Sequence, residues 1–374
     1  MRHLLRLGAF LSGVVFICLL CPSSVRAQTF ETPVAYPTGA YAPNGVALGD
    51  LNGDGHLDVV VANADSPGTV AVLLGNGDGT LQTAVTYPAG SYPEFVVLAD
   101  FNRDGHLDVA VGNRSIDTAG YVSILLGNGD GTLRAPVSYG PFTDAFSLAV
   151  ADFNKDGALD IAVADVASGS LLLGNGDGTF RLGTPIGASN AVFFAVVNLN
   201  GNPNLSLVSA NNAGKEIQVL TGNGKGQFTL GSSAAVSTPP IALAAADFNG
   251  DGKPDIAVAD EAVNNRNSNV TVFESSSKGY AGTRYPYGDE PRLVVIADIN
   301  KDGKPDIVTE NEFNGTVDIF INNGTGGFGA PIVLQDGGIT AASVAVGDLN
   351  GDGKPDIVVS DGQIPGAVHV LLQQ

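Results

Sequence analysis

Residues Val46–Asp58 read Val-Ala-Leu-Gly-Asp-Leu-Asn-Gly-Asp-Gly-His-Leu-Asp, a short apolar run that leads into a nine-residue acidic loop. The loop pattern D-x-N-x-D-G-x-x-D occurs at Asp50–Asp58, Asp100–Asp108, Asp152–Asp160, Asp247–Asp255, Asp298–Asp306 and Asp348–Asp356. A degenerate copy, Asn198–Ser206, fills the remaining gap, so that successive copies begin 46 to 52 residues apart. A nearly constant period of this length indicates a repeat architecture.

Each repeat contains four strand-like segments and no helical periodicity. Apolar runs such as Phe95–Ala99 precede the loop, and runs such as Val59–Val61 follow it. A third run, for example Val70–Leu74, leads into Asn-Gly-Asp-Gly, a sequence that favours a tight hairpin turn before a fourth run such as Leu81–Tyr87. Four short strands per repeat are typical of a propeller blade, so seven repeats predict an all-β, seven-bladed β-propeller. A solenoid of stacked coils is the alternative.

The two ends of the chain favour the closed ring over the solenoid. Residues Phe30–Pro37 resemble the fourth-strand segment Leu81–Pro88, yet no blade precedes them. The chain ends at Val368–Gln374, a third-strand segment with no fourth strand after it. We therefore expect the N-terminal strand to complete the last blade, which removes two exposed strand edges.

Composition excludes several classes of protein. The chain has 374 residues, of which 50 are Gly and 20 are Pro, while only 15% are charged. These values argue against a helical bundle, a coiled coil and a disordered protein. The formal charge of −20 argues against nucleic acid or an anionic membrane surface as the main partner.

Residues 1–27 have the features of a signal peptide. Arg2 and Arg6 precede a short apolar run, and Val25-Arg26-Ala27 forms a plausible cleavage site. The run is shorter than a membrane-spanning helix, so we expect cleavage, no transmembrane anchor and a secreted or extracytoplasmic domain over residues 28–374. Both cysteines, Cys18 and Cys21, lie in this segment, and the mature chain therefore has no disulfide. Another stabilising element is needed.

The acidic loops supply one, because their carboxylates would repel one another without a cation between them. Positions 1, 3 and 5 direct side-chain oxygens to one point, Gly at position 6 allows a sharp turn, and position 9 adds a last carboxylate. Hard oxygen ligands in this number favour Ca²⁺. The first six positions match an EF-hand loop, but the last acid comes too early and the flanking segments are strands.

Position 7 of the loop has no common side-chain chemistry, as expected for a ligand that uses its backbone carbonyl. A zinc or acid–base role for His56 and His106 is disfavoured because Ala and Lys take the same position elsewhere. The expected calcium ligands are Asp50, Asn52, Asp54, His56 and Asp58; Asp100, Asn102, Asp104, His106 and Asp108; Asp152, Asn154, Asp156, Ala158 and Asp160; Asp247, Asn249, Asp251, Lys253 and Asp255; Asp298, Asn300, Asp302, Lys304 and Asp306; and Asp348, Asn350, Asp352, Lys354 and Asp356. The degenerate loop Asn198–Ser206 has no carboxylate, so we expect about six Ca²⁺ ions and none in this loop.

These loops, together with Leu73-Leu74-Gly75-Asn76-Gly77-Asp78-Gly79-Thr80, resemble the FG-GAP/VCBS repeats of the integrin α-subunit head and of many secreted bacterial proteins. The resemblance covers all seven repeats. It implies a seven-bladed propeller with Ca²⁺ in the loop between the first and second strands of a blade, held by Asp50, Asn52, Asp54 and Asp58 and their counterparts. It does not define one function, since members include adhesion modules, lectins and polysaccharide-degrading enzymes.

Residues that recur in every repeat are interpreted as structural, and residues present in one or two repeats as candidates for function. The residue thirteen positions after the first Asp of the loop is always Asn or Asp, which indicates a structural turn residue. Irregular residues concentrate in the connections expected on the face opposite the calcium loops. The candidate ligand-binding residues there are Tyr287, Asp289, Glu290, Arg292, Tyr41, Tyr92 and Phe142, with the long Asp260–Asn269 loop beside them. Packing of the aromatic rings between blades is the alternative.

The sequence favours a binding, adhesion or scaffold module, expected to be a monomer with an extracellular protein or glycan as its ligand. A calcium-stabilised lectin is a second hypothesis. A polysaccharide lyase or other glycan-active enzyme is a weaker third, because the mature chain has no Cys and no G-x-S-x-G motif. No catalytic residue is therefore assigned, although a lyase base of the Tyr, Lys or Arg type needs no short motif.

Overall fold

The computed structural model of the protein describes residues 28–114, 119–199, 203–261, 268–276, 279–286, 291–338, 340–363 and 365–374. The predicted signal peptide, 1–27, lies outside this range. Across the described residues, no helix is long and apolar enough to cross a membrane.

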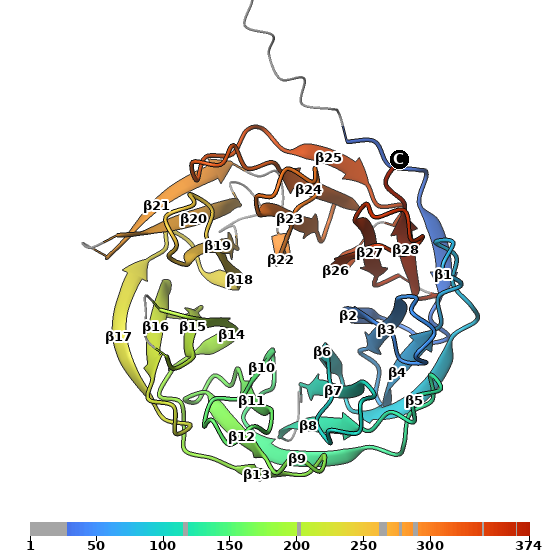
Figure 1. Cartoon of the computed structure of the whole chain (residues 1–374), viewed down its shortest axis with the longest axis horizontal. Coiled ribbons are helices and arrows are strands. Elements are labelled where there is room, and N and C mark those ends of the chain that lie inside the picture. Colours follow the sequence, from blue (N-terminus) through green and yellow to red (C-terminus); the bar gives the residue numbers. More distant parts are fainter. Residues whose placement is uncertain are drawn as a thin grey trace, which may run out of the picture.

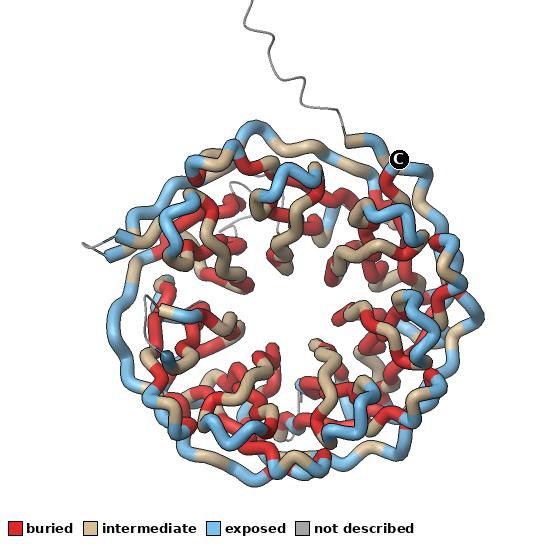
Figure 2. Tube along the Cα trace, in the orientation of Figure 1, coloured by how far each residue is buried: buried red, intermediate tan, exposed pale blue. Residues whose placement is uncertain are grey.

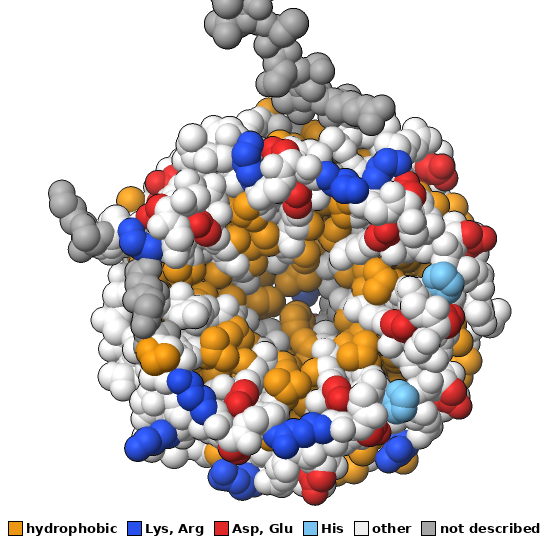
Figure 3. Space-filling view, in the orientation of Figure 1, with side chains coloured by type: hydrophobic (Ala, Val, Ile, Leu, Met, Phe, Trp, Pro, Cys, Tyr) orange, Lys and Arg blue, Asp and Glu red, His pale blue; other side chains and the backbone are white. Residues whose placement is uncertain are grey.

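The chain forms a ring of seven four-stranded antiparallel sheets around a central axis (Figure 1), along which the space-filling view shows a channel (Figure 3). Blade 1 contains β2 (Pro43–Gly49), β3 (Asp58–Asn63), β4 (Gly68–Leu73) and β5 (Val85–Gly90); blade 2 contains β6 (Pro93–Ala99), β7 (Asp108–Asn113), β8 (Gly120–Leu125) and β9 (Val137–Phe142). Blade 3 contains β10 (Leu148–Ala151), β11 (Asp160–Val163), β12 (Ser170–Gly174) and β13 (Phe180–Leu182); blade 4 contains β14 (Ala191–Val197), β15 (Ser206–Asn211), β16 (Glu216–Gly222) and β17 (Phe228–Ala235). Blade 5 contains β18 (Pro240–Ala246), β19 (Asp255–Asp260), β20 (Asn269–Ser276) and β21 (Gly279–Pro286); blade 6 contains β22 (Pro291–Ala297), β23 (Asp306–Asn311), β24 (Thr316–Phe320) and β25 (Ile332–Gln335). Blade 7 contains β26 (Ala341–Gly347), β27 (Asp356–Asp361), β28 (Ala367–Leu371) and the N-terminal strand β1 (Val34–Pro37).

The ring closes as the chain ends predict. Strand β1 is the outer strand of blade 7, with Val34 opposite Val370 and Pro37 opposite Ala367. An isolated bridge between Phe30 and Gln373 extends the pairing. The seven-bladed, closed propeller is thus confirmed and the solenoid excluded.

Burial explains the sequence pattern of the strands. The second and third strands of each blade are almost continuously buried because neighbouring blades cover both of their faces, and the fourth strand is largely exposed at the rim (Figure 2). The fourth strand also begins later than the apolar pattern predicts: in blade 1 it starts at Val85, and Leu81 makes only an isolated bridge to Gly75.

Hydrogen bonds join neighbouring blades at the Asn-Gly-Asp-Gly turns. The N–H of Gly79 donates to the carbonyl of Leu349 in the preceding blade, and Gly131 donates to Leu51 in the same way. Gly79 has a φ of 85°, and a Cβ atom there would lie 2.6 Å from Leu372. Glycine is therefore needed both for the turn and for the close approach of the preceding blade.

Candidate functional site

The acidic loops connect the first and second strands of the blades, as predicted, and their backbone N–H groups fix the carboxylates. In blade 1, Oδ1 of Asp50 accepts from Gly53 at 2.7 Å, and Oδ2 accepts from Gly55 at 2.9 Å. Oδ1 of Asp54 accepts from the N–H of His56, and this bond holds the pKa of the Asp54 carboxyl below its usual range. Backbone N–H groups thus orient the carboxylates at positions 1 and 5 of the loop.

The last Asp of the loop has a different environment, because it points into the protein. Asp108 is fully buried, with Oδ2 accepting from the N–H of Phe101 at 2.9 Å and Oδ1 from the N–H of Gly127 at 2.8 Å. The same pair of bonds is made by Asp58, Asp160, Asp255, Asp306 and Asp356. Each of these carboxylates fastens its loop to the end of the third strand.

Calcium fits the chemistry of these donors, although the described residues contain no preassembled cluster of three Asp, Glu, His or Cys side chains around one point. Both oxygens of the last Asp already accept N–H bonds near the end of the third strand, while the side chains at positions 1, 3 and 5 lie at the surface. A carboxylate oxygen that accepts one N–H bond retains a lone pair for a cation. In blades 5, 6 and 7 the carboxylate at loop position 5 forms an ion pair with the lysine at position 7. The distances are 3.0 Å for Lys253, 3.1 Å for Lys304 and 2.8 Å for Lys354, so these loops already attract positive charge.

A pair of substitutions in one loop separates the two kinds of carboxylate. Asp108→Ala leaves two buried N–H groups without acceptors, and we expect a loss of about 2–4 kcal/mol in the free energy of unfolding that is already present in chelator. Asp104→Ala removes an exposed carboxylate, so its cost should be small in chelator and larger in Ca²⁺. Denaturant unfolding of both variants, with and without chelator, measures the difference. Equal losses in chelator would contradict the assignment.

The degenerate loop of blade 4 keeps one of the hydrogen bonds that attach the other loops to the end of the third strand. Ser206 occupies the position of the last Asp, and its Oγ accepts from the N–H of Gly222 at 3.2 Å. Residues 200–202 of this loop lie outside the described range. Blade 4 thus retains a structural substitute for the buried carboxylate without its charge.

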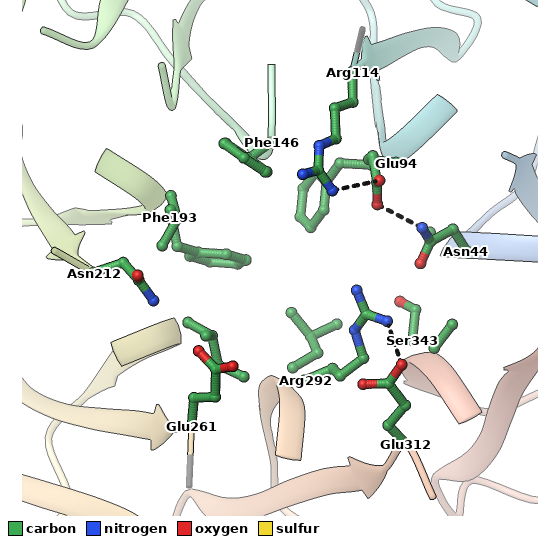
Figure 4. A pocket seen from close by; sticks show the side chains of 16 residues that line it. Asn44, Glu94, Arg114, Phe146, Phe193, Asn212, Glu261, Arg292, Glu312 and Ser343 are labelled. Atoms are coloured by element: carbon green, nitrogen blue, oxygen red, sulfur yellow. Dashed lines mark hydrogen bonds and ion pairs between the residues drawn. The ribbon is translucent and has the colours of Figure 1, made fainter. Parts of the chain in front are cut away.

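A second candidate site is a pocket on the propeller axis, at the end of the channel opposite the acidic loops (Figure 4). Its cavity volume is about 420 Å³, within the usual range for small-ligand sites. All seven blades contribute to the lining: Asn44, Gly45, Glu94, Phe95, Arg114, Phe146, Val192, Phe193, Asn212, Ile241, Glu261, Arg292, Leu293, Glu312, Ala342 and Ser343. We call this the channel-mouth pocket.

The repeat presents different side chains to the pocket from two equivalent positions. The first lies six residues before the first Asp of the acidic loop and is occupied by Asn44, Glu94, Phe146, Val192, Ile241, Arg292 and Ala342. The second lies fourteen residues after it and is occupied by Ala64, Arg114, Val166, Asn212, Glu261, Glu312 and Gly362, of which Arg114, Asn212, Glu261 and Glu312 line the pocket. Backbone bonds fix the second position: Arg114 donates to the carbonyl of Tyr92, and Asn212 to that of Asn190. The backbone is therefore similar in every blade, while the side chains at these two positions differ around the ring.

Charged side chains of the pocket form two groups on different blades. Arg114 lies 3.6 Å from Glu94 and 3.9 Å from Asp144, and its guanidinium is 5.0 Å from the centre of the Phe146 ring. Asn44 donates to the second oxygen of Glu94 at 2.5 Å. On the other side, Arg292 contacts Glu312 at 2.9 Å.

Blade 6 adds a buried carboxyl directly beneath this second group. Oε2 of Glu310 accepts from the N–H of Leu293 at 3.1 Å, at a bulge where β22 and β23 change register. Complete burial raises the pKa of Glu310 to about 8. Burial thus favours the uncharged form of Glu310, and Arg292 donates to Glu312.

Aromatic rings occupy the deeper part of the pocket. Phe95 and Phe193, from blades 2 and 4, meet edge to face at 5.5 Å across the intervening blade. The charged side chains of Glu94, Arg114, Arg292 and Glu312 also line the pocket (Figure 4), whereas Figure 3 shows the opposite face, on which acidic and basic side chains surround the channel. The pocket thus combines an apolar base with a charged rim.

Of the predicted ligand-face residues that the structure describes, Arg292 lines this pocket. Tyr41 is 55% exposed, but it is not part of the lining, and Tyr92 contributes through its carbonyl. Phe142 is 4% exposed and packs in the core, so we do not retain it as a ligand-binding residue. Tyr287, Asp289 and Glu290 lie outside the described residues, as does most of the Asp260–Asn269 loop.

Sequence reasoning missed Glu94, Arg114, Asn212 and Glu312. The available signal was the variation at two fixed offsets from the acidic loop, where the rest of the repeat is uniform. The residue thirteen positions after the first Asp is, by contrast, structural as predicted. Asn63, Asp165 and their equivalents are buried, and Asp165 accepts bonds from Ala167 and Ser170.

Comparison with known proteins identifies the family. The FG-GAP-like repeat matches residues 50–111, 113–163, 197–258 and 298–359, more than half of the chain, and the protein belongs to this family. No protein of curated function shows significant sequence similarity to the chain.

Similar solved structures show the same fold. One is the BBS1N structure determined in complex with ARL6DN and soaked with lead, with a TM-score of 0.63, 14% identity, and coverage of 92% of this chain and 96% of that one. Another is an Agrocybe aegerita lectin that recognises non-reducing terminal N-acetylglucosamine, with a TM-score of 0.51, 19% identity, and coverage of 79% and 80%. At these identities the likeness concerns the fold.

Proposed function

We propose that this FG-GAP propeller is a secreted, calcium-binding module that binds an extracellular protein or glycan at the channel-mouth pocket. The observation that carries the proposal is the distribution of variation around the ring. Strands, acidic loops and turns repeat from blade to blade, whereas the two positions that line the pocket differ in charge, size and polarity. Such variation is what a single asymmetric ligand on a pseudo-symmetric axis requires.

The acidic loops have a separate, supporting role in this proposal. Asp50, Asn52, Asp54, the carbonyl of His56 and Asp58, with their counterparts in the other five intact loops, would hold Ca²⁺. The ion would neutralise the negative charge of the loops and stabilise the propeller. These loops lie at the opposite end of the channel from the pocket, so Ca²⁺ should influence binding through stability.

A lectin is the more specific form of the same proposal. Sugar binding commonly combines an aromatic face with planar polar groups, and Phe193, Asn212 and Glu261 line one side of the pocket together. One of the structurally similar proteins is a lectin. Turnover assays on any glycan that binds would distinguish a lectin from a glycan-active enzyme.

Filling the channel-mouth pocket with a bulky side chain tests whether the ligand binds there. Ala342→Tyr places a ring in the lining, and we expect it to weaken binding at least about tenfold, or about 1.4 kcal/mol. The readout is affinity for ligands found on arrays of glycans and extracellular proteins. Ala64→Tyr is the matched control, because Ala64 occupies an equivalent ring position that is not part of the lining. Normal binding by Ala342→Tyr with an unchanged melting temperature would refute this site.

A further inference from the structure

Only two of the fourteen ring positions carry a cation, in a chain whose formal charge is −20. They are Arg114 of blade 2 and Arg292 of blade 6. Figure 4 shows the two guanidinium groups entering the pocket from opposite sides. This arrangement places planar hydrogen-bond donors on both sides of one central space.

Both guanidinium groups retain donors for a ligand. Glu94 and Asp144 lie 3.6 and 3.9 Å from Arg114, which is ion-pair distance without a hydrogen bond, and the Arg114 side chain is 45% exposed. Arg292 uses Nη1 for Glu312 and is 38% exposed. A guanidinium has five N–H donors, and partly exposed ion pairs contribute little, so a ligand carboxylate can take up the free donors.

The acidic residues of the lining restrict what kind of anion fits. Glu94, Glu261 and Glu312 bring three carboxylates next to two cations, which disfavours inorganic phosphate and densely charged polyanions. The same carboxylates accept hydrogen bonds from hydroxyl groups. The preferred ligand therefore has one negative charge and several O–H donors.

The pocket also offers an apolar surface to a ligand. Phe146 and Phe193 expose parts of their rings to the pocket, and a cavity of about 420 Å³ has room for a sugar ring. A hexuronate combines one carboxylate, several hydroxyl groups and a C–H face that packs on an aromatic ring.

We infer that the channel-mouth pocket recognises a glycan through a hexuronate residue, with the carboxylate bound between Arg114 and Arg292. This inference rests on the proposed function of the pocket as the binding site. The carboxylates of the rim then bind the sugar hydroxyls, and the phenylalanine rings support the sugar face.

The test uses an array of uronate-containing oligosaccharides together with the same oligosaccharides after reduction of their carboxyl groups to CH₂OH. We expect at least one uronate glycan to bind and its reduced counterpart to bind at least about tenfold more weakly. Binding should remain in the presence of millimolar inorganic phosphate. Equal binding of a reduced glycan, absence of binding to every uronate glycan, or preference for oligoglutamate peptides would each overturn the inference.

Variants show whether the carboxylate lies where proposed. Arg292→Gln and Arg114→Gln should each remove most of the preference for the unreduced glycan. Arg181→Gln, an equal change of charge on the exposed outer strand of blade 3, should leave it intact. If a neutral ligand binds and Ala342→Tyr abolishes that binding, the binding function stands and the hexuronate inference fails. If a uronate glycan binds equally to wild type, Arg292→Gln and Ala342→Tyr, both fail.

Discussion

Removing Ca²⁺ should lower the melting temperature of the protein more than any single substitution. At about 1 mM Ca²⁺ and a Kd of about 10⁻⁴ M, each site contributes about 1.4 kcal/mol, and six sites together contribute on the order of 8 kcal/mol. The physical reason is the density of charge, since every intact loop has three aspartates within nine residues. Calorimetry in Ca²⁺ and in chelator measures the shift, and high salt should partly restore the chelated protein by screening.

Stoichiometry provides the stricter check of the same prediction. Calorimetric titration should give six ions, and anomalous diffraction should place none at Asn198–Ser206. A metal in that loop, or fewer than five ions elsewhere, would contradict the assignment. Asn52→Lys, which introduces a cation into one loop, should reduce the count by one and leave the other five sites unchanged.

Deleting residues 28–37 should have the second largest effect, because it opens the ring. The deletion removes strand β1 and its pairing with β28, as well as the flanking bonds from Glu31 to Leu372 and from Gln374 to Thr29. With a net value of about 1 kcal/mol per hydrogen bond, we expect a loss on the order of 5 kcal/mol. The bare edge of β28 should also cause concentration-dependent aggregation, measurable by light scattering.

A circular permutant is the matched control for this deletion. Gln374 donates to the carbonyl of Thr29 at 2.8 Å, so a short Asn-Gly-Asp-Gly turn can join the two ends. A chain that starts at Thr38 and ends with residues 28–37 after this turn contains the same strands. It should melt near the parent temperature and remain monomeric. A deletion variant that behaves like the permutant would show that β1 does not close the ring.

Much of the propeller fold could be predicted because the residues that define its loops are close in sequence. Asp50, Gly53 and Asp54 form one loop through local bonds, and each loop is repeated at a constant spacing. The position of the last Asp could be read from the repeat, but its burial could not. Asp58 bonds to Gly75 in the next hairpin of the blade, and that contact exists only once the strands are paired.

The candidate pocket was harder to predict because its residues come from all seven blades. The sequence places Arg292 near Tyr287, Asp289 and Glu290, whereas its contact in the structure is Glu312, across β22 and β23. Glu94 and Asn44, one repeat apart, meet only because neighbouring inner strands converge at the axis. Local patterns contain no information about such convergence.

The sequence by itself therefore determined the number of blades, the closure of the ring and the positions of the acidic loops, since these depend on local turn chemistry and on a fixed period. The tertiary structure alone decided which aspartates are buried, as Asp108 is, and which side chains share the axis. Closing seven similar units into a ring brings the same two strand positions of every blade to one centre. Residues 198 positions apart in the sequence, such as Arg114 and Glu312, then line one pocket.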